Sequence, residues 1–409
     1  MTDTETTHQA ELLRRARAGV FGIFWVNGFL LGLWVVHIPA IESKIGISHS
    51  TLGTLLLLLA CGAIGGMQVS GPLTDRFGSR TLVFAAAVLL SVAAVGPGVA
   101  TQAWHLGLAL VLFGFANGSL DVAMNTQAVE VERRYRRPIM SAFHALFSIG
   151  GVSGSVVGAA TLGVGVGPAP TLACSAIAGI IATTAFTRLL LVRREPAHRA
   201  EPAEQAHGRF SARVLALGAL AFVLMLSEGV ANDWSTLQVK DHLGTNDSTA
   251  ALAFGAFSLT MTLGRLTADR VAGALGPVAI VRYGALIAAT GLILIITSSE
   301  IFITLTGWAL FGIGLSGTVP QIFTTAGNLG SGSAGTNMSR VVGLGYLGFL
   351  AGPAIIGWVT IAVPLTVAMV VPLVCVLAAA AGAGTVRRTA IHSDVDHSSV
   401  SLSVQDLDG

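Results

Sequence analysis

Long apolar segments recur along the whole of this chain of 409 residues, and each is about as long as a membrane-crossing helix. Such a helix needs roughly 20 predominantly apolar residues. Charged residues make up only 11% of the chain, against about 25% in soluble globular proteins. We therefore predict an all-α membrane protein with twelve spans. The expected spans are 18–40, 50–72, 81–100, 103–128, 138–163, 168–191, 212–237, 248–268, 278–298, 300–325, 336–361 and 364–386.

Positive charge on the segments that join these spans is concentrated on one side. An even number of spans places both termini on that side, which carries arginine clusters such as 133–134 and 193–194. The opposite loops carry only Lys44 and Lys240. The positive-inside rule therefore predicts cytoplasmic termini in a cell (inner) membrane. A net charge of +2 gives no reason to expect a nucleic-acid partner.

A polar stretch between the sixth and seventh spans divides the chain. It is rich in Arg, Glu, Pro and His and contains no apolar run. The tail at 387–409 is rich in Ser and Asp, a composition typical of disorder. We expect a cytoplasmic N-terminal tail (1–17), a six-helix bundle (18–191), a cytoplasmic linker (192–211), a second six-helix bundle (212–386) and a disordered cytoplasmic tail (387–409).

Short motifs recur in the two halves at a single offset. The Leu-Phe-Gly sequence that ends at Gly114 returns 198 residues later, ending at Gly312, in the fourth and tenth spans. Several matches at one offset, in corresponding spans, indicate that the halves are parallel repeats of one six-helix unit. The other matching positions are Met140-Ser141 with Met338-Ser339, Gly150 with Gly348, and Gly154 with Gly352.

A compact charged turn between the second and third spans has a weaker copy after the eighth. The first runs Gly71-Pro-Leu-Thr-Asp75-Arg76-Phe-Gly78-Ser-Arg80, and the second runs Gly264-Arg-Leu-Thr-Ala-Asp269-Arg270-Val-Ala-Gly273. The first turn resembles the signature of the major facilitator superfamily. That resemblance implies the major facilitator fold, with a substrate site between two bundles near the membrane midplane. The matching residues are Gly71, Leu73, Asp75, Arg76, Gly78 and Arg80.

We interpret both turns as gating latches on the cytoplasmic side. Asp75 can accept hydrogen bonds from a neighbouring helix end, while Arg76 and Arg80 can meet carboxylates or lipid phosphates. Such contacts can hold this side closed in one conformational state only. The alternative is a solvated loop that merely satisfies the positive-inside rule. The expected gating residues are Asp75, Arg76, Arg80, Arg265, Asp269 and Arg270.

The fourth span carries a narrower resemblance. Its segment Asn117-Gly-Ser-Leu-Asp121-Val-Ala-Met-Asn125 is similar to the acidic-x-Ala-x-Asn pattern of fucose:proton symporters. Segments 137–148 and 228–235 resemble bacterial inner-membrane proteins related to a proposed rhizopine (inositol-amine) transporter. Together these resemblances imply proton-coupled symport of a small polar, sugar- or polyol-like solute. One departure is that the first span lacks the Asn-Asp pair that such sugar symporters carry shortly before an Ile-Pro, here Ile38-Pro39.

Three polar residues of the fourth span share one helix face. Asn117, Asp121 and Asn125 lie four residues apart, which places them one above another on a helix. A carboxylate in hydrocarbon costs at least about 2.5 kcal/mol, so Asp121 should face the protein interior and have a role. We predict that Asp121 binds substrate or a proton. The alternative is a structural contact between helices, with Asn125 as its hydrogen-bond partner.

Polar residues of other spans are expected to line the same site. Glu228 lies well inside the seventh span and would be a second coupling carboxylate. His144 can relay protons or bind a hydroxyl group, or it can be a neutral buried histidine bonded to a helix partner. Pro320 should bend the tenth span beside Gln321. The expected substrate- or proton-binding residues are Asp121, Asn117, Asn125, His144, Glu228, Asn232, Trp34, Asn27 and Gln321.

These patterns favour a secondary active transporter that works by alternating access and acts as a monomer. The chain contains no Gly-x4-Gly-Lys-Ser/Thr loop, so ATP is not expected to drive it. We expect no cofactor, no metal site and no enzymatic activity; the partners would be a small-molecule substrate, a coupling proton and the lipid bilayer. Two alternatives stay open: a proton-coupled efflux antiporter for drugs or metabolites, and a transporter-like membrane sensor without flux.

Overall fold

The computed structural model describes residues 3–135, 139–192, 211–329 and 334–387, and no strand occurs among them. Twelve helical segments are long and apolar enough to cross a membrane, which confirms the predicted fold class and number of spans. Most of the expected linker (192–211) and nearly all of the expected C-terminal tail (387–409) lie outside the described residues. The helices are α1 (Asp3–Ile45), α2 (His49–Phe77), α3 (Ser79–Ala93), α4 (Val95–Val99), α5 (Ala103–Tyr135), α6 (Met140–Gly163), α7 (Pro168–Thr187), α8 (Ala212–Leu243), α9 (Asp247–Leu275), α10 (Pro277–Thr297), α11 (Ile301–Leu315), α12 (Thr318–Gly327), α13 (Ala334–Val359), α14 (Leu365–Ala368), α15 (Val370–Gly382) and the 3-10 helix η1 (Ala383–Val386).

The expected tenth span is interrupted near its proline. Helix α11 ends at Leu315, and α12 begins two residues before Pro320. Proline has no N–H and clashes with the preceding turn, so a continuous helix is disfavoured here. Side-chain hydroxyls meet two carbonyls at the break: Ser316 Oγ donates to Ile313 O at 2.7 Å and Thr318 Oγ1 donates to Leu315 O at 2.8 Å. The bend predicted from Pro320 is therefore present as a break between two helices.

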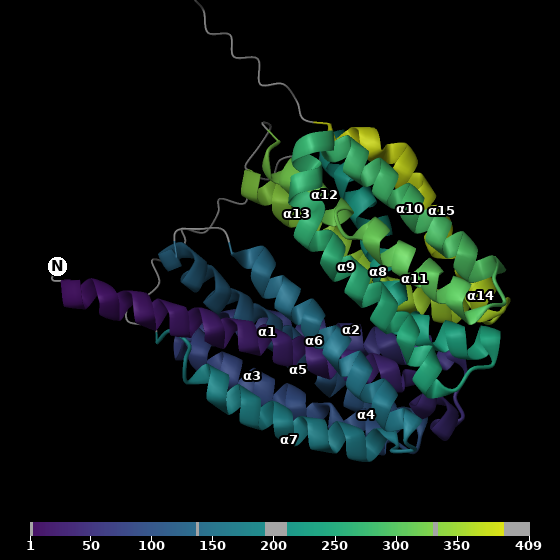
Figure 1. Cartoon of the computed structure of the whole chain (residues 1–409), viewed down its shortest axis with the longest axis horizontal. Coiled ribbons are helices and arrows are strands. Elements are labelled where there is room, and N and C mark those ends of the chain that lie inside the picture. Colours follow the sequence, from purple (N-terminus) through teal and green to yellow (C-terminus); the bar gives the residue numbers. More distant parts are fainter. Residues whose placement is uncertain (1–2, 136–138, 193–210, 330–333, 388–409) are drawn as a thin grey trace, which may run out of the picture.

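The first helix is longer than the sequence suggested. We expected a polar tail up to residue 17, but α1 begins at Asp3 and continues without interruption into the first span. Its beginning therefore projects past the neighbouring helices, and Figure 1 shows this projection beside the N-terminal label. Continuity of the backbone hydrogen bonds explains the extension, because no proline or glycine interrupts residues 3–17.

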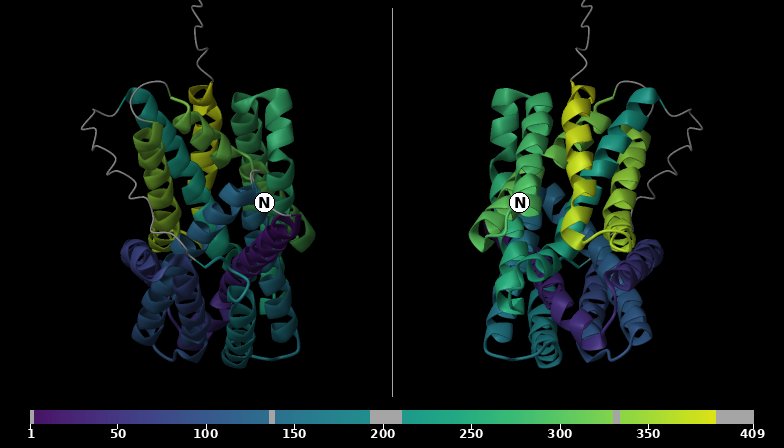
Figure 2. Two further views of the ribbon diagram at one scale, coloured as in Figure 1. Left: turned by 90° about the vertical axis from the view of Figure 1, so that its left-hand side faces the viewer. Right: turned by 90° about the vertical axis from the view of Figure 1, so that its right-hand side faces the viewer.

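The spans form two groups of six, residues 3–192 and residues 211–387, which we call the first half and the second half. Figure 1 shows them as the purple-to-blue and the green-to-yellow groups, and Figure 2 shows one above the other from both sides. Corresponding helices pair within each half, because α1 packs on α6 as α8 packs on α13. Both pairs depend on a glycine: a Cβ on Gly150 would overlap Trp25 O, and a Cβ on Gly348 would overlap Phe222 O. These two glycines are 198 residues apart, so the repeat seen in the sequence corresponds to a repeated close contact.

The two halves meet at one end of the molecule and diverge at the other. We call the end where α1 begins the terminal end, and the end where α1 finishes and α2 begins the closed end. Figure 1 shows the halves separating toward the terminal end. Helix α6 packs on α9 and α2 packs on α13, which joins the halves. A close backbone approach between the halves joins Gly53 and Gly357, where a Cβ on Gly53 would lie 2.7 Å from the Cα of Gly357.

Candidate functional site

Asp121 lies near the middle of α5. Within the described structure it is hydrogen-bonded to an uncharged side chain of the same helix, Asn125. Asn125 Nδ2 donates to the backbone oxygen of Asp121 at 2.9 Å and to its Oδ1 at 3.1 Å. No ion pair with Asp121 occurs among the described residues. One turn away, Asn117 has a buried Oδ1 that lacks a hydrogen-bond partner within the described structure. Asp121 therefore has an amide partner but no described counter-ion.

Glu228, the second carboxylate expected at the site, has a counter-ion. Arg265 Nη2 of α9 lies 2.9 Å from Glu228 Oε1 of α8, and the two side chains are 33% and 16% exposed. The sequence grouped Arg265 with Asp269 in the second latch, whereas the structure pairs it with Glu228 inside the second half. The neighbouring packing of α8 and α9 explains this pairing. Asn232 Nδ2 donates to the backbone oxygen of Glu228 at 3.0 Å.

Tyr346 lies within electrostatic range of both of these carboxylates. It lies on α13, is 42% exposed, and interacts electrostatically with Asp121 of the first half and Glu228 of the second. The sequence reasoning missed Tyr346. A phenol inside an apolar span was the available signal. Tyrosine is rare in this chain, which has only three, so each one inside a span could have been singled out. A phenol can both donate and accept a hydrogen bond.

His144 is the counterpart of Tyr346 on the first half. It is exposed on α6, its ring meets the Phe24 ring edge-on with centroids 5.3 Å apart, and it interacts electrostatically with Arg265 across the divide. The alternative of a buried histidine bonded to a helix partner does not describe this exposed ring. We define the central site as Asp121, His144, Glu228, Arg265 and Tyr346.

The other predicted site residues are buried beside the central site or apart from it. On α1, Asn27 Nδ2 lies 3.7 Å from the sulfur of Met124 on α5, and Trp34 packs at 6.4 Å from the ring of Phe113. Asn27 Oδ1 and Trp34 Nε1 are both buried without a hydrogen-bond partner among the described groups. Gln321 is 8% exposed on α12, and no described side-chain contact joins it to the central site.

The arginines of the first charged turn make local contacts at the terminal end. Arg80 Nε donates to Thr187 O at 2.9 Å and Arg80 Nη2 to Arg188 O at 3.3 Å, so Arg80 caps the end of α7. Its partners are carbonyls of the first half, not the carboxylates or phosphates we expected. Arg76 is exposed, with its guanidinium 5.1 Å from the Phe77 ring centre, and Arg270 is exposed on α9. The side chains of Asp75 and Asp269 lie outside the described part of the structure.

A charged layer joins the halves at the closed end. His49 Nδ1 lies 2.6 Å from Glu42 Oε1 of α1, and His49 Nε2 lies 2.6 Å from Asp241 Oδ2 of α8. Lys240 Nζ lies 2.8 Å from Asp247 Oδ1 and donates to Pro39 O of the first half at 3.3 Å. The sequence analysis treated Lys240 only as a loop charge, because the Pro39 carbonyl to which it donates lies 201 residues away in the chain.

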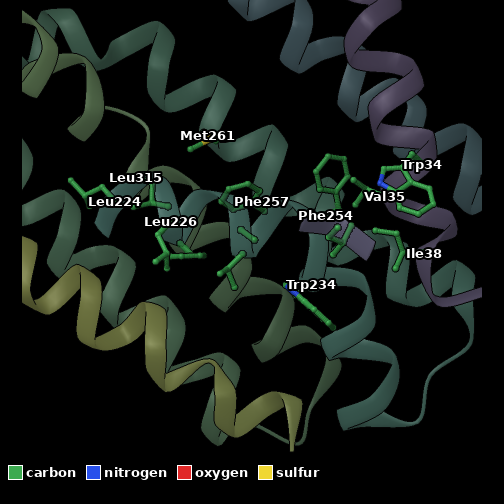
Figure 3. Close-up of a cluster of buried hydrophobic side chains, with 14 of the residues drawn as sticks. Trp34, Val35, Ile38, Leu224, Leu226, Trp234, Phe254, Phe257, Met261 and Leu315 are labelled. Carbon is green, nitrogen blue, oxygen red and sulfur yellow. The ribbon is translucent and has the colours of Figure 1, made fainter. Parts of the chain in front are cut away.

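Buried apolar side chains of both halves form one cluster, part of which Figure 3 shows. Trp234 of this cluster is fully buried, and its Nε1 donates to Pro353 O at 3.0 Å. The labelled residues are Trp34, Val35, Ile38, Leu224, Leu226, Trp234, Phe254, Phe257, Met261 and Leu315.

Comparison with known proteins agrees with this architecture. The family model described as Major Facilitator Superfamily matches residues 20–237. An MFS-type transporter of Yersinia pestis is 33% identical over 89% of this chain and 94% of its own length. Membrane protein MosC of Rhizobium meliloti is 32% identical over 84% of this chain and 83% of its own length. A crystal structure of a variant of the nucleoside transporter NupG is 11% identical and superposes with a TM-score of 0.73, covering 90% of this chain and 99% of that one. This chain therefore belongs to the major facilitator superfamily of membrane transporters.

Proposed function

We propose that this protein moves a small polar, sugar- or polyol-like solute across the cell membrane by alternating access, coupled to protons. The observation that carries the proposal is Asp121, a carboxylate inside a span with an amide partner and no described counter-ion. Asp121 interacts electrostatically with Tyr346 of the second half, so this carboxylate faces the other half of the protein. Ionisable residues inside membrane spans are typical of substrate and proton pathways.

Three buried polar atoms that lack a hydrogen-bond partner within the described structure support a polar solute. Asn27 Oδ1 and Asn117 Oδ1 are acceptors, and Trp34 Nε1 is a donor. Each would cost about 1–3 kcal/mol if it stayed unsatisfied. Hydroxyl groups of a sugar or polyol can both donate and accept, so such a solute can pair with acceptors and donors alike. The fold shared with a nucleoside transporter is compatible with such a solute.

The two carboxylates differ in whether they have a counter-ion, and this difference supports proton coupling. Glu228 is already paired with Arg265, so its charge is balanced within the second half. Asp121 has no such partner, and a proton would remove the cost of keeping its charge inside the membrane. We propose that Asp121 carries the coupling proton and that Glu228 and Arg265 orient the solute.

The arginine distribution supports an orientation for this cycle. We propose that the terminal end is cytoplasmic, because that side carries most of the arginines of the connecting segments. The described state would then be open to the cytoplasm and closed to the outside. Within this proposal, each half moves as a unit, the protein works as a monomer, and Arg76, Arg80 and Arg270 act at the cytoplasmic side.

Solute flux into proteoliposomes tests this function. Purified protein is first screened for thermal stabilisation by sugars and polyols, and by lipophilic cations as a contrasting set. Stabilising solutes are then tested for uptake driven by a proton gradient. We expect a sugar or polyol to be taken up, and Asp121→Asn to abolish gradient-driven uptake while solute exchange without a gradient continues. Thr126→Ala serves as the control on α5, because Thr126 is exposed and its hydroxyl donates to Val122 O of the same helix.

Three outcomes would overturn parts of this proposal. Binding of lipophilic cations without any sugar or polyol would indicate an efflux antiporter. Binding without flux would indicate a sensor. Unchanged gradient-driven uptake by an expressed Asp121→Asn variant would exclude Asp121 as the proton carrier.

A further inference from the structure

We propose that His49 is a second proton-binding site, outside the central site, and that its proton stabilises the closed end. The inference concerns the gate alone and does not depend on which solute the protein carries. His49 is the first residue of α2, and the carboxylates at its two ring nitrogens belong to different halves of the protein.

The geometry at His49 favours a proton on both ring nitrogens. Glu42 Oε1 lies 2.6 Å from Nδ1, and Asp241 Oδ2 lies 2.6 Å from Nε2. A neutral imidazole donates from one nitrogen only, so its other nitrogen would direct a lone pair at a carboxylate oxygen. An imidazolium donates from both nitrogens, and each bond is then charge-assisted.

The surrounding charges make this proton depend on closure of the halves. The N-terminus of a helix disfavours a positive charge, so α2 itself does not favour an imidazolium at its first residue. Glu42 stays beside His49 in any state, because both belong to the first half. Asp241 belongs to the second half and leaves when the closed end opens. The open gate therefore keeps one carboxylate and holds the proton less tightly than the closed gate.

Other groups packed around His49 are consistent with this role. Lys240 of α8 is already paired with Asp247 of α9, so it does not replace His49 as the partner of Asp241. The Trp234 ring of α8 lies edge-on at 5.9 Å and carries no charge. From α13, the backbone of Gly357 approaches His49 O. His49 is the side chain that links Glu42 and Asp241 in the described structure, and its 27% exposure lets solvent reach it.

Linkage then predicts how pH acts on the gate. The closed form binds the proton more tightly, so acid favours closure and rising pH favours opening of the closed end. For one linked proton, the ratio of closed to open molecules falls by at most about tenfold per pH unit. The fall begins above the ordinary histidine range of about pH 6.5, where the open form loses its proton first.

The test measures the distance across the closed end as a function of pH. Spin labels are placed through Val164→Cys and Ile361→Cys, which are 78% and 74% exposed and lie in different halves. The background carries Cys61→Ser, Cys174→Ser and Cys375→Ser, so no native thiol is labelled. Pulsed electron–electron resonance in detergent micelles without solute then gives the closed and open populations.

Matched variants assign the pH response to His49. We expect His49→Gln to remove it, because glutamine cannot take up the proton. His242→Gln should keep it, since His242 lies on the same end but bonds Ser298 O within the second half. All variants are compared in the Asp121→Asn background, so that a proton on the central site does not contribute to the response. Asp241→Asn retains both His49 and Glu42 and should make the response shallower, which provides a second variant if His49→Gln does not fold.

The combination of results decides the proposal. A pH response that is present in the Asp121→Asn background and survives the addition of His242→Gln, but disappears when His49→Gln is added, supports the proposal. A closed population of this background that does not change with pH overturns it. So does a response that remains after His49→Gln is added. Failure of sugar or polyol flux would affect only the proposed function, because this experiment contains no solute.

Discussion

The two ends of the contact between the halves are built differently. At the closed end, helices of both halves approach to the backbone at Gly53 and Gly357 and are joined by a charged layer. At the terminal end the halves diverge, and the described contacts of Arg80 stay within the first half. The charged turn that carries the family signature is therefore at one end, while the interactions that hold the described state are at the other.

This difference indicates that contacts at the closed end set the conformational state. A helix interface that closes through glycines and buried side chains is bistable, because small separations lose most of its packing. The opposite end can then part without breaking the halves themselves, whose helices are held by their own close contacts. Substitutions that weaken only the contacts at the closed end test whether those contacts hold the described state.

The largest effect is expected from Gly53→Leu. Its Cβ would lie 2.7 Å from the Gly357 Cα, so a leucine must push α2 and α13 apart. Overpacking costs about 1–3 kcal/mol, which should lower the ratio of closed to open molecules about 5- to 160-fold. The measurement is the distance between labels at Val164→Cys and Ile361→Cys. Gly343→Leu is the matched control on α13, because nothing lies within 4 Å of a Cβ there. An unchanged distance in Gly53→Leu would show that the Gly53 contact does not hold the closed end.

A smaller effect is expected from Thr236→Val. Thr236 is fully buried on α8, and its hydroxyl donates to Val35 O of the other half at 3.3 Å. Loss of one such bond costs about 1 kcal/mol, so the closed population relative to the open one should fall about fivefold. Thr262→Val is the control, since its hydroxyl bonds Ser258 O within α9. Equal shifts in both variants would mean that the bond across the halves has no special effect on closure.

The smallest effect is expected from the ion pair of Glu228 with Arg265. The pair lies within the second half and is partly exposed, so its coupling energy should be about 0.5 kcal/mol. Thermal denaturation of Glu228→Ala, Arg265→Ala and the double variant measures this coupling. The label distance at the closed end should stay the same in all three. A shift of that distance would show that the central site acts on the gate even without solute.

Prediction from sequence succeeded where the signal is local or repeated. Runs of apolar residues located twelve spans, and the offset of 198 residues identified Gly150 and Gly348 as equivalent before their contacts were known. Pro320 predicted an interruption that is present between α11 and α12. Each of these features follows from the properties of a short segment, such as hydropathy, a missing N–H or a missing side chain.

Prediction was incomplete where the signal is a contact between distant segments. Arg265 was assigned to a latch because Asp269 is one turn away, whereas its described partner is Glu228 on another helix. His49 was not singled out, because a histidine at the start of a span is unremarkable until Asp241 is placed beside it. Tyr346 was missed for the same reason. Helical periodicity gives the face of a residue but not the helix that it meets.

The sequence alone therefore determined the number of spans, the repeat, the family resemblance and the polar face around Asp121. These depend on hydrophobicity and helix geometry, which act over a few turns of chain. The tertiary structure was needed to show which end is closed, that Glu228 has a counter-ion while Asp121 has none described, and that His49 joins the two halves. Those properties depend on distances between residues far apart in the chain, and packing of whole helices sets such distances.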